Sequence, residues 1–373
     1  MNKIKVITIF GTRPEAIKMA PLVKELQNRE NIQVKVCVTA QHREMLDQVL
    51  TLFQIVPEFD LDIMKKKQSL TGITTRIIRG LDELFEVEKP DLILVHGDTT
   101  TTFAGALAAF YKQIKVGHVE AGLRTFDKYF PFPEEMNRKL TGAIADLHFA
   151  PTMSSKNNLL REGVCESDIY LTGNTVIDAM KYTVEEDYKF KNKILKKINF
   201  NDKKVIMVTA HRRENWGEGI LNICKALKHI VLENETVEIV YLVHLNPVVK
   251  DMVHNELEGL KQVHLLPPLD TKETHNLMNR SFLVMTDSGG LQEEAPHLGK
   301  PVLVLRDSTE RPEAVEAGTV KLVGTDMDKI IECTNLLINN SEEYIKMSKA
   351  INPYGDGTAS VKIADAIQEY FKK

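Results

Sequence analysis

The sequence predicts an α/β protein with two doubly wound domains, each a parallel sheet covered by helices on both faces. Apolar, β-branched runs alternate with helical patterns along most of the chain. These runs are apolar throughout, which is typical of parallel strands buried on both faces. The 373 residues also exceed what one hydrophobic core usually holds, so two domains are expected.

The predicted strands form two sets, and predicted helices lie between and after them. The first set comprises residues 5–10, 34–39, 92–96, 115–119 and 147–150. The second comprises residues 205–209, 238–243, 263–265, 282–285 and 302–305. Predicted helices include 14–26, 99–111, 219–232 and 325–337. The first set is followed by Leu171-Thr172-Gly173-Asn174, so we place the domain boundary there, with domains over residues 1–171 and 172–353.

Composition excludes several classes of protein. A formal net charge of −4 argues against general nucleic-acid binding, so an anionic ligand must meet a local basic cluster. Cys37, Cys165, Cys224 and Cys333 are far apart and share no CxxC spacing. We therefore expect no disulfide framework, no metal site and a reducing cytoplasm. The apolar run at the N-terminus is too short for a signal peptide, and no run is long enough to span a membrane.

The first predicted strand leads into a loop that carries two basic residues. Thr12 can cap the following helix and Pro14 suits its first turn. Arg13 then stands at the carboxyl end of the strand, where open α/β sheets bind ligands. Lys18 lies a little over one turn later; it could reach the same place or be a solvated lysine. The loop has neither the GxGxxG nor the GxxxxGK[ST] pattern, which argues against a dinucleotide or Walker loop.

Three acidic residues follow strands or begin a helix in the first domain. Asp98 follows strand 92–96, and helix N-capping alone could explain it. Glu120 comes directly after strand 115–119 and before an Ala-Gly break, which packing explains poorly. Glu134 follows Pro133 and suits the first turn of a helix on electrostatic grounds. Three such acids in one domain are nevertheless what general acid/base chemistry requires.

The second domain carries basic residues and a glycine pair at its strand ends. Residues 282–314 predict a strand, a turn at Ser288-Gly289-Gly290, a helix and another strand. The glycines would let backbone N–H groups approach an anion at the helix N-terminus, with Glu294 one turn away. A simple βαβ unit with surface charges is the alternative. Arg306 and Arg311 follow the next strand, and both could reach the same crevice.

Two histidines also follow strands of the second domain. His211 comes after strand 205–209 and precedes two arginines, a pattern that favours a phosphate contact. His244 follows strand 238–243.

Taken together, these segments resemble the non-hydrolysing UDP-N-acetylglucosamine 2-epimerases. The resemblance implies two Rossmann-like domains of the glycosyltransferase-B type, with the active site in the interdomain cleft. It also implies that a last helix, about 359–371 within residues 354–373, joins the first domain. The matching strings, in chain order, are FGTRPEAIKMAPL, TAQHREMLDQVL, HGDTTTT, GHVEAGLRT, PFPEEMNR, LTGNTVIDA, TAHRREN, VHLNP, TDSGGLQEEAPHLGKPVLVLR, TERPEA and NPYGDG.

The resemblance implies roles for individual residues. Asp98, Glu120 and Glu134 would be the acids that act at the sugar, and Lys18 would lie near the sugar phosphate. Glu294 would bind the ribose hydroxyls, and Gln41, Glu44 and His244 match a region where relatives bind UDP-N-acetylglucosamine as an activator. A homodimer and no cofactor are expected. The residues that would hold UDP are Arg13, His211, Ser288, Gly289, Gly290, Glu294 and Arg311.

One departure from the family pattern concerns the uracil ring. Relatives often carry an aromatic residue near the position of Thr274, where this chain has Thr274 and His275. This leaves the contact with the base in doubt without affecting the expected reaction.

The chemistry of the sugar points to elimination and re-addition of UDP. C2 is not adjacent to a carbonyl, so its proton cannot simply be removed and returned. Either a transient oxidation or a departing group is needed, and the absence of a nicotinamide-binding fingerprint from the sequence disfavours oxidation. Loss of UDP across C1–C2 would leave a glycal, to which UDP re-adds after protonation of the other face. Arg13, His211 and Arg311 would stabilise the leaving group. Three alternatives stay open: a glycosyltransferase of the same fold, a hydrolysing epimerase, and a nucleotide-sugar sensor without turnover.

Overall fold

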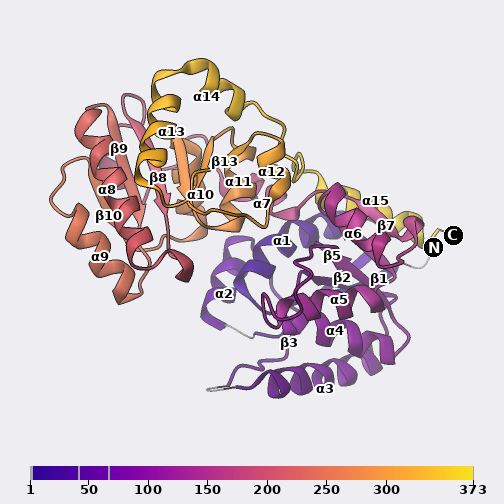
Figure 1. Ribbon diagram of the computed structural model, residues 1–373. Helices are drawn as coiled ribbons and strands as arrows, with labels where there is room; N and C mark the ends of the chain where they lie inside the picture. Colours follow the sequence, from indigo (N-terminus) through magenta and orange to yellow (C-terminus); the bar gives the residue numbers. More distant parts are fainter. Residues whose placement is uncertain (1–2, 41–42, 66–67, 373) are drawn as a thin grey trace. The chain divides into compact units, whose positions relative to one another are not determined.

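The computed structural model of the protein describes residues 3–40, 43–65 and 68–372, and its chain divides into two compact units (Figure 1). The first unit contains Met1–Lys181 and Tyr354–Lys373, and the second contains Tyr182–Pro353. The chain thus leaves the first unit once and returns to it near the C-terminus. The sequence placed the domain limits at 171/172 and 353/354. That the chain folds as independent parts with these limits stays a prediction.

The first unit is built on a parallel sheet of seven strands in the order β3-β2-β1-β4-β5-β6-β7. Alternate residues of the central strands face opposite cores. Leu92 and Leu94 join one hydrophobic cluster, whereas Ile93 and Val95 join the other. The strands are β1 Ile4–Phe10, β2 Ile32–Val38, β3 Phe59–Asp60, β4 Leu92–His96, β5 Lys115–Val119, β6 Leu147–Ala150 and β7 Ile169–Leu171.

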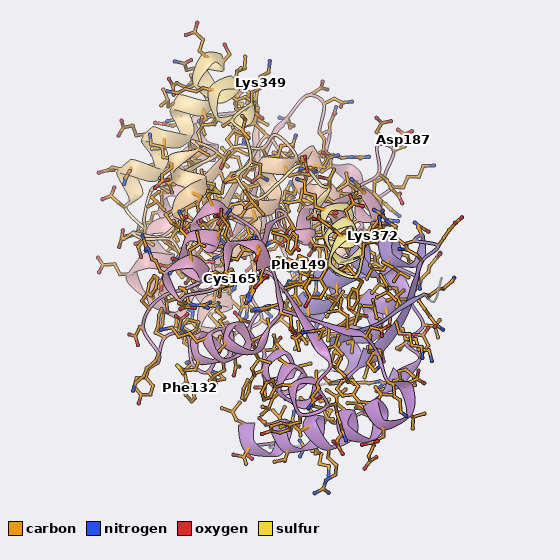
Figure 2. The ribbon with its side chains drawn as sticks, turned by 90° about the vertical axis from the view of Figure 1, so that its right-hand side faces the viewer. Phe132, Phe149, Cys165, Asp187, Lys349 and Lys372 are labelled. Atoms are coloured by element: carbon orange, nitrogen blue, oxygen red, sulfur yellow. The ribbon has the colours of Figure 1, made fainter. Side chains whose placement is uncertain are left out.

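Helices cover both faces of this sheet (Figure 1). Helices α1 Arg13–Gln27, α2 Arg43–Leu52 and α15 Ala359–Tyr370 contribute to one core, and α3 Leu70–Glu88 and α4 Thr100–Tyr111 contribute to the other. Buried Phe149 on β6 and exposed Phe132 in the loop before α5 mark the inside and outside of this unit (Figure 2). The remaining helices are α5 Glu134–Ile144, α6 Met153–Arg161, η1 Glu166–Asp168 and α7 Thr175–Thr183.

Helix α15 belongs to the core of the first unit although it comes last in the chain. It packs against α1, and its Ile363 and Ile367 are fully buried in the same cluster as β1. The Asp178 carboxylate of α7 accepts hydrogen bonds from the backbone N–H groups of Ala359 and Ser360, at 3.2 and 2.8 Å. This carboxylate thereby caps the N-terminus of α15.

The second unit has a parallel sheet of six strands in the order β10-β9-β8-β11-β12-β13. Helices α8, α9 and α13 share one core with β8 and β9, and α10 and α11 contact the sheet separately. The strands are β8 Lys204–Thr209, β9 Val237–Leu242, β10 Val263–Leu266, β11 Leu283–Thr286, β12 Val302–Val304 and β13 Val320–Leu322. The helices are η2 Leu195–Lys197, η3 Arg213–Asn215, α8 Glu218–Glu233, α9 Pro247–Leu257, α10 Thr271–Arg280, α11 Gly289–His297, α12 Pro312–Glu316, α13 Met327–Asn339 and α14 Ser341–Ser348.

The predicted α/β class, with two parallel sheets covered by helices, is confirmed. Each of the ten predicted strands is present, with ends displaced by two residues at most. Strands β3, β7 and β13 were not predicted. All three lie at sheet edges and have only two or three residues, so their hydrophobic pattern is too short to recognise. Within the described residues, no helix combines the length and apolarity needed to cross a bilayer.

Candidate active site

Each sheet reverses its strand order at one point, and four of the predicted site residues follow the strands on either side of it. The order reverses between β1 and β4 in the first unit and between β8 and β11 in the second. Open parallel sheets bind ligands beyond the carboxyl ends of the strands at such a point. Arg13 and Asp98 follow β1 and β4, and His211 and Ser288 follow β8 and β11.

The loop after β1 is held by a capping box at the start of α1. The Thr12 hydroxyl accepts from the Glu15 backbone N–H, and the Glu15 carboxylate accepts from the N–H groups of Thr12 and Gly11, at 2.8 and 3.1 Å. The Thr99 hydroxyl donates to the other oxygen of Glu15 at 2.7 Å. Burial raises the pKa of Glu15, although these hydrogen bonds oppose the shift. This unpredicted carboxylate therefore ties the Arg13 loop to the start of α4.

Glu120 lies at the centre of a polar cluster at the end of β5. Its Oε1 forms an ion pair with the Lys18 ammonium and accepts a hydrogen bond from the Asn174 amide at 2.8 Å. Its other oxygen is 3.7 Å from Nε2 of His96. The structure thus brings together Lys18 and Glu120, which the sequence singled out separately. Asn174 was missed as a site residue, although it lies in one of the strings that carry the family resemblance.

The backbone around Glu120 adopts unusual conformations. Glu120 itself has a φ of 62°, in the left-handed region that a residue with a side chain rarely occupies. Gly97, with a φ of 68°, lies close by: a Cβ there would be 3.3 Å from Oε2 of Glu120. A non-glycine backbone outlier at a strand end often marks a functional site, since the surrounding structure must hold it in place.

Two buried histidines support this cluster. Nε2 of His118 is 2.7 Å from the carbonyl oxygen of Gly97. Burial lowers the pKa of His118 to about 3 and that of His96 to about 4; the Glu120 carboxylate partly opposes the shift at His96. Both imidazoles are therefore neutral at neutral pH, and the cation paired with Glu120 is Lys18.

Asp98 is held by the arginine of α5 and does not cap α4. The N-cap is Thr99, whose hydroxyl accepts from the Thr102 backbone N–H, so the capping explanation for Asp98 is wrong. Arg138 donates to Asp98 Oδ2 at 2.5 Å and to Glu135 at 3.3 Å. Glu135 is fully buried and accepts from two backbone N–H groups of the loop before α5. Asp98 thus has a cationic partner, which the sequence reasoning did not find.

Glu134 begins α5, as the sequence predicted, and carries an unsatisfied oxygen. Its Oε2 is buried and has no hydrogen-bond partner among the residues that the structure describes. A buried carboxylate oxygen without a partner is uncommon and calls for an explanation, because its desolvation is costly. A polar ligand group at this oxygen would remove that cost.

In the second unit, buried Asp287 fixes the loop that carries His211. Its Oδ2 accepts from the backbone N–H groups of His211 and Arg212, at 2.7 and 2.8 Å, and from the Asn215 amide at 3.1 Å. Its Oδ1 is 3.6 Å from Nδ1 of His211. Burial lowers the pKa of His211, and the Asp287 carboxylate partly opposes this. Asp287 was missed as a site residue; its position after a buried strand was the available signal.

Helix α11 presents a glycine-rich N-terminus beside an arginine. Ser288 is the N-cap and makes no side-chain capping bond, and Gly289 and Gly290 form the first turn. A Cβ on Gly289 would be 3.9 Å from the guanidinium of Arg311. Arg311 is in turn paired with buried Glu293. Backbone N–H groups, the helix dipole and a positive charge therefore meet at this turn, an arrangement that binds anions.

The other predicted residues of the second unit have different settings. Arg306 is buried and paired with Glu214, so the structure gives it a partner other than the α11 turn. The His211 and His244 rings stack with centroids 5.2 Å apart and an interplanar angle of 11°.

Two residues of the first unit were expected near an activator site. Gln41 lies outside the described residues, and Glu44 is placed on α2 without a described side chain. The Gln41 and Glu44 assignments therefore stay predictions.

Comparison with known proteins identifies the family of the chain. A model of the UDP-N-acetylglucosamine 2-epimerase family matches residues 24–368. The chain belongs to this family of isomerases. A Bacillus subtilis protein named UDP-N-acetylglucosamine 2-epimerase is 58% identical to it, over 98% of this chain and 96% of its own length. The expectation of an epimerase of this family is thereby confirmed.

Solved structures agree with this assignment. A UDP-GlcNAc 2-epimerase from Neisseria meningitidis, crystallised with UDP-GlcNAc, is 53% identical over 98% of this chain and 100% of its own, with a TM-score of 0.86. A kitacinnamycin glycotransferase matches with a TM-score of 0.68 at 11% identity, which shows likeness of fold alone. Two Rossmann-like domains of the glycosyltransferase-B type therefore describe the fold, as predicted.

Proposed function

We propose that the protein reversibly epimerises UDP-N-acetylglucosamine to UDP-N-acetylmannosamine by eliminating UDP and adding it back, without hydrolysis. One observation carries this proposal. In the first unit three carboxylates follow strands or begin α5, and the second unit offers backbone N–H groups, a histidine and an arginine after its strands. Elimination of UDP requires both sets, since a proton must move at the sugar while a charged leaving group stays bound.

In the first half of the reaction, a carboxylate removes the proton from C2. The C1–O bond breaks, its electron pair leaves with UDP, and a C1=C2 glycal remains. In the second half, a protonated acid delivers a proton to the opposite face of C2, and an oxygen of the bound diphosphate forms the C1–O bond again. No atom is gained or lost from substrate to product, and no redox step occurs.

The proposed acids and bases are Asp98, Glu120 and Glu134. Paired with Lys18, Glu120 is favoured in its charged form, as a base requires. Asp98 has a similar setting beside Arg138. Glu134 has a buried oxygen without a partner among the described residues, which a polar group of the bound sugar would satisfy.

The diphosphate is assigned to the α11 turn and its neighbours. Ser288, Gly289 and Gly290 would offer N–H groups to it, and Arg311 would add a charge-assisted bond. His211, held by Asp287, would contribute a further contact, and Arg13 and Lys18 would act from the first unit. Two independently folding parts, residues 1–171 with 354–373 and residues 172–353, would thus divide the acid/base work from nucleotide binding.

The decisive experiment is proton NMR of UDP-N-acetylglucosamine with the enzyme in deuterated water and no added NAD. We expect solvent deuterium at C2 of both UDP-sugars, because each passage through the glycal exchanges that proton. Retention of the original hydrogen at C2 during turnover would eliminate the proton-exchange mechanism in favour of hydride transfer. The same incubation tests the alternatives, since free N-acetylmannosamine would indicate hydrolysis and no change would indicate a transferase or sensor.

Three parts of the proposal concern the cell and the assembly. The product would supply synthesis of a cell-surface polysaccharide, the enzyme would form a homodimer, and UDP-N-acetylglucosamine would activate it near Gln41, Glu44 and His244. The stacking of His244 on His211 supports the last point, because it joins an activator residue to a proposed substrate residue. Initial rates that rise more steeply than hyperbolically with UDP-N-acetylglucosamine would indicate such activation.

A further inference from the structure

We propose that His275 is a positioning residue that orients Glu294 and thereby makes the nucleotide site selective for ribose. This inference rests on the proposed function, which places the ribose hydroxyls at Glu294. The observation behind it is a buried chain of side chains, Thr183–His275–Glu294, that links the end of α7, α10 and α11 within residues 182–353.

The geometry of this chain leaves the imidazole little freedom. Nδ1 of His275 is 2.7 Å from the hydroxyl oxygen of Thr183, and Nε2 is 3.3 Å from Oε2 of Glu294. The His275 side chain is 4% exposed and that of Glu294 is 14% exposed. The imidazole is therefore inside the protein, whereas the carboxylate reaches partly accessible space.

The chemistry of the three groups fixes where the proton lies. A carboxylate can only accept a hydrogen bond, so Nε2 of His275 must carry a proton toward Glu294. The Thr183 hydroxyl lies 2.7 Å from Nδ1 and, because a hydroxyl can donate or accept, it satisfies this nitrogen. The imidazole thus faces Glu294 with Nε2 across 3.3 Å, a contact that orients the carboxylate.

Neighbouring contacts prevent the chain from rearranging easily. The amide of Asn276, next to His275, donates to the backbone oxygen of Thr183 at 2.7 Å, and its oxygen accepts from the Glu185 N–H at 2.9 Å. Thr183 is thus fixed through both its backbone and its hydroxyl. A histidine that merely filled the core would need none of this alignment with a carboxylate at the edge of the site.

The oriented carboxylate lies beside the turn assigned to the diphosphate. A Cβ on Gly290 would be 3.3 Å from Oε1 of Glu294, so this oxygen lies over the first turn of α11. In a nucleoside diphosphate the ribose adjoins the phosphates, so a carboxylate one turn from an anion site is well placed for the ribose hydroxyls. With Oε2 directed at His275, the carboxylate presents a defined edge to the sugar.

This arrangement predicts selectivity against deoxyribose. A site built to bond a hydroxyl rejects an analogue that lacks it, because a buried polar group is left unpaired. We expect 2′-deoxy-UDP or 3′-deoxy-UDP to bind about 10- to 100-fold more weakly than UDP, in line with a hydrogen bond to a charged group. Loss of the His275 contact should let the carboxylate turn and should reduce that ratio.

The test is calorimetric measurement of Kd for UDP, 2′-deoxy-UDP and 3′-deoxy-UDP with five variants. Glu294→Gln tests whether the carboxylate recognises the ribose hydroxyls. His275→Phe removes both ring contacts, and His275→Gln restores an N–H near the position of Nε2. Thr183→Val removes only the hydroxyl. His229→Phe is the matched control, because His229 forms an exposed pair with Glu233 on α8 at 3.1 Å.

We expect Glu294→Gln and His275→Phe to bring the deoxy-to-ribo ratio of Kd to within about threefold of unity, on the same hydrogen-bond scale. His275→Gln should retain most of the selectivity, Thr183→Val should lose part of it, and His229→Phe should match the wild type. A folded His275→Phe or Thr183→Val protein with wild-type selectivity would overturn the inference. So would an equal loss of affinity for all three nucleotides, which indicates a merely structural role.

Failure of the proposed function gives a different result. If wild-type protein does not bind UDP, the nucleotide site itself is wrong. If it binds UDP but Glu294→Gln keeps the wild-type ratio, the ribose assignment of Glu294 is wrong, and the inference fails with it. Should His275→Phe not fold, His275→Gln and Thr183→Val still decide the question, because each retains a side chain of similar shape.

Discussion

The two units place opposite charges at their strand ends and support them in opposite ways. In the first unit the loops present carboxylates, and cations stand behind them: Lys18 pairs with Glu120, and Arg138 pairs with Asp98. In the second unit the α11 turn presents backbone N–H groups and the guanidinium of Arg311. This guanidinium is paired with the buried carboxylate of Glu293. The same α/β design thus yields carboxylates paired with cations in one unit and N–H groups beside a paired arginine in the other, which we propose serve acid/base chemistry and anion binding respectively.

This difference suggests a rule: the charge of the residue that pairs with a loop side chain indicates whether the loop serves proton transfer or anion binding. A carboxylate beside a cation is kept charged and ready to take a proton. A buried carboxylate can instead fix a loop or a guanidinium in the position that binds an anion. Asp287 does this by accepting hydrogen bonds from the backbone N–H groups of His211 and Arg212. The predictions below test this contrast, from the largest effect to the smallest.

The largest effect should follow removal of an acid from the first unit. Glu120→Gln keeps the shape of the side chain but cannot take a proton, so the rate of epimerisation should fall by about 10²–10⁴. The affinity for UDP, measured by calorimetry, should stay close to that of the wild type. A Glu120→Gln enzyme with near-normal turnover, or one that no longer binds UDP, would break the division of labour between the units.

The opposite pattern is expected for the second unit. Arg311→Ala removes a charge-assisted contact worth roughly 1.5–3 kcal/mol, so Kd for UDP should rise by about 10- to 150-fold. Calorimetry on this variant should be compared with Arg79→Ala, an exposed arginine on α3 that belongs to no proposed site. If Arg311→Ala binds UDP as tightly as the control, the arginine serves only to neutralise buried Glu293.

The first unit should also be the more sensitive to acid. The pKa of buried His118 is lowered to about 3 in the folded state, so the unfolded chain takes up the proton more readily between this value and about 6.5. Stability is therefore fully present above pH 6.5 and is lost as the pH falls, by about 1.4 kcal/mol per pH unit. Buried His96 acts in the same direction down to about pH 4.

Urea-unfolding curves at pH 7, 6 and 5, followed by hydrogen exchange of peptides from β5 and β9, would measure this effect. His118→Gln, which cannot be protonated, should show a shallower pH dependence in β5 by about the amount given above. Equal acid sensitivity of β5 in the variant and the wild type would mean that the buried imidazole does not distinguish the two units.

The smallest effect concerns the segment that returns to the first unit. Asp178→Ala removes the carboxylate that accepts two N–H groups at the start of α15, and should cost about 1–2 kcal/mol of stability. The loss should appear as a lower unfolding midpoint for β1 and α1, with no change in β9. Asp168→Ala on η1 is a suitable control, because this half-buried residue caps no part of α15.

Sequence reasoning found the strands that are long and buried on both faces, because a continuous apolar run is a strong signal. It missed β3, β7 and β13, whose two or three residues carry little pattern. It also found residues directly after strands, since topology alone places those at one edge of a sheet. Glu120 and His211 are examples.

The supporting residues could not be found in the same way. Arg138, Asn174 and Asp287 act through partners 40, 54 and 76 residues away in sequence. Such pairings depend on how helices pack, which no local pattern specifies. The capping role wrongly considered for Asp98 has a similar origin. Two adjacent residues, Asp98 and Thr99, could each cap α4, and Arg138 binds the first of them.

The return of α15 to the first unit bears on the order in which the protein folds during synthesis. Residues 182–353 form a continuous stretch and can complete their own core as they leave the ribosome. The first unit cannot, because Ile363 and Ile367 fill part of its core and are made after the whole second unit. Until then the part of this core that α15 fills stays exposed, which is a hazard for aggregation. The earliest part of the chain to emerge is thus the last to mature, and nascent chains stalled before α15 should depend on chaperones more than the finished protein does.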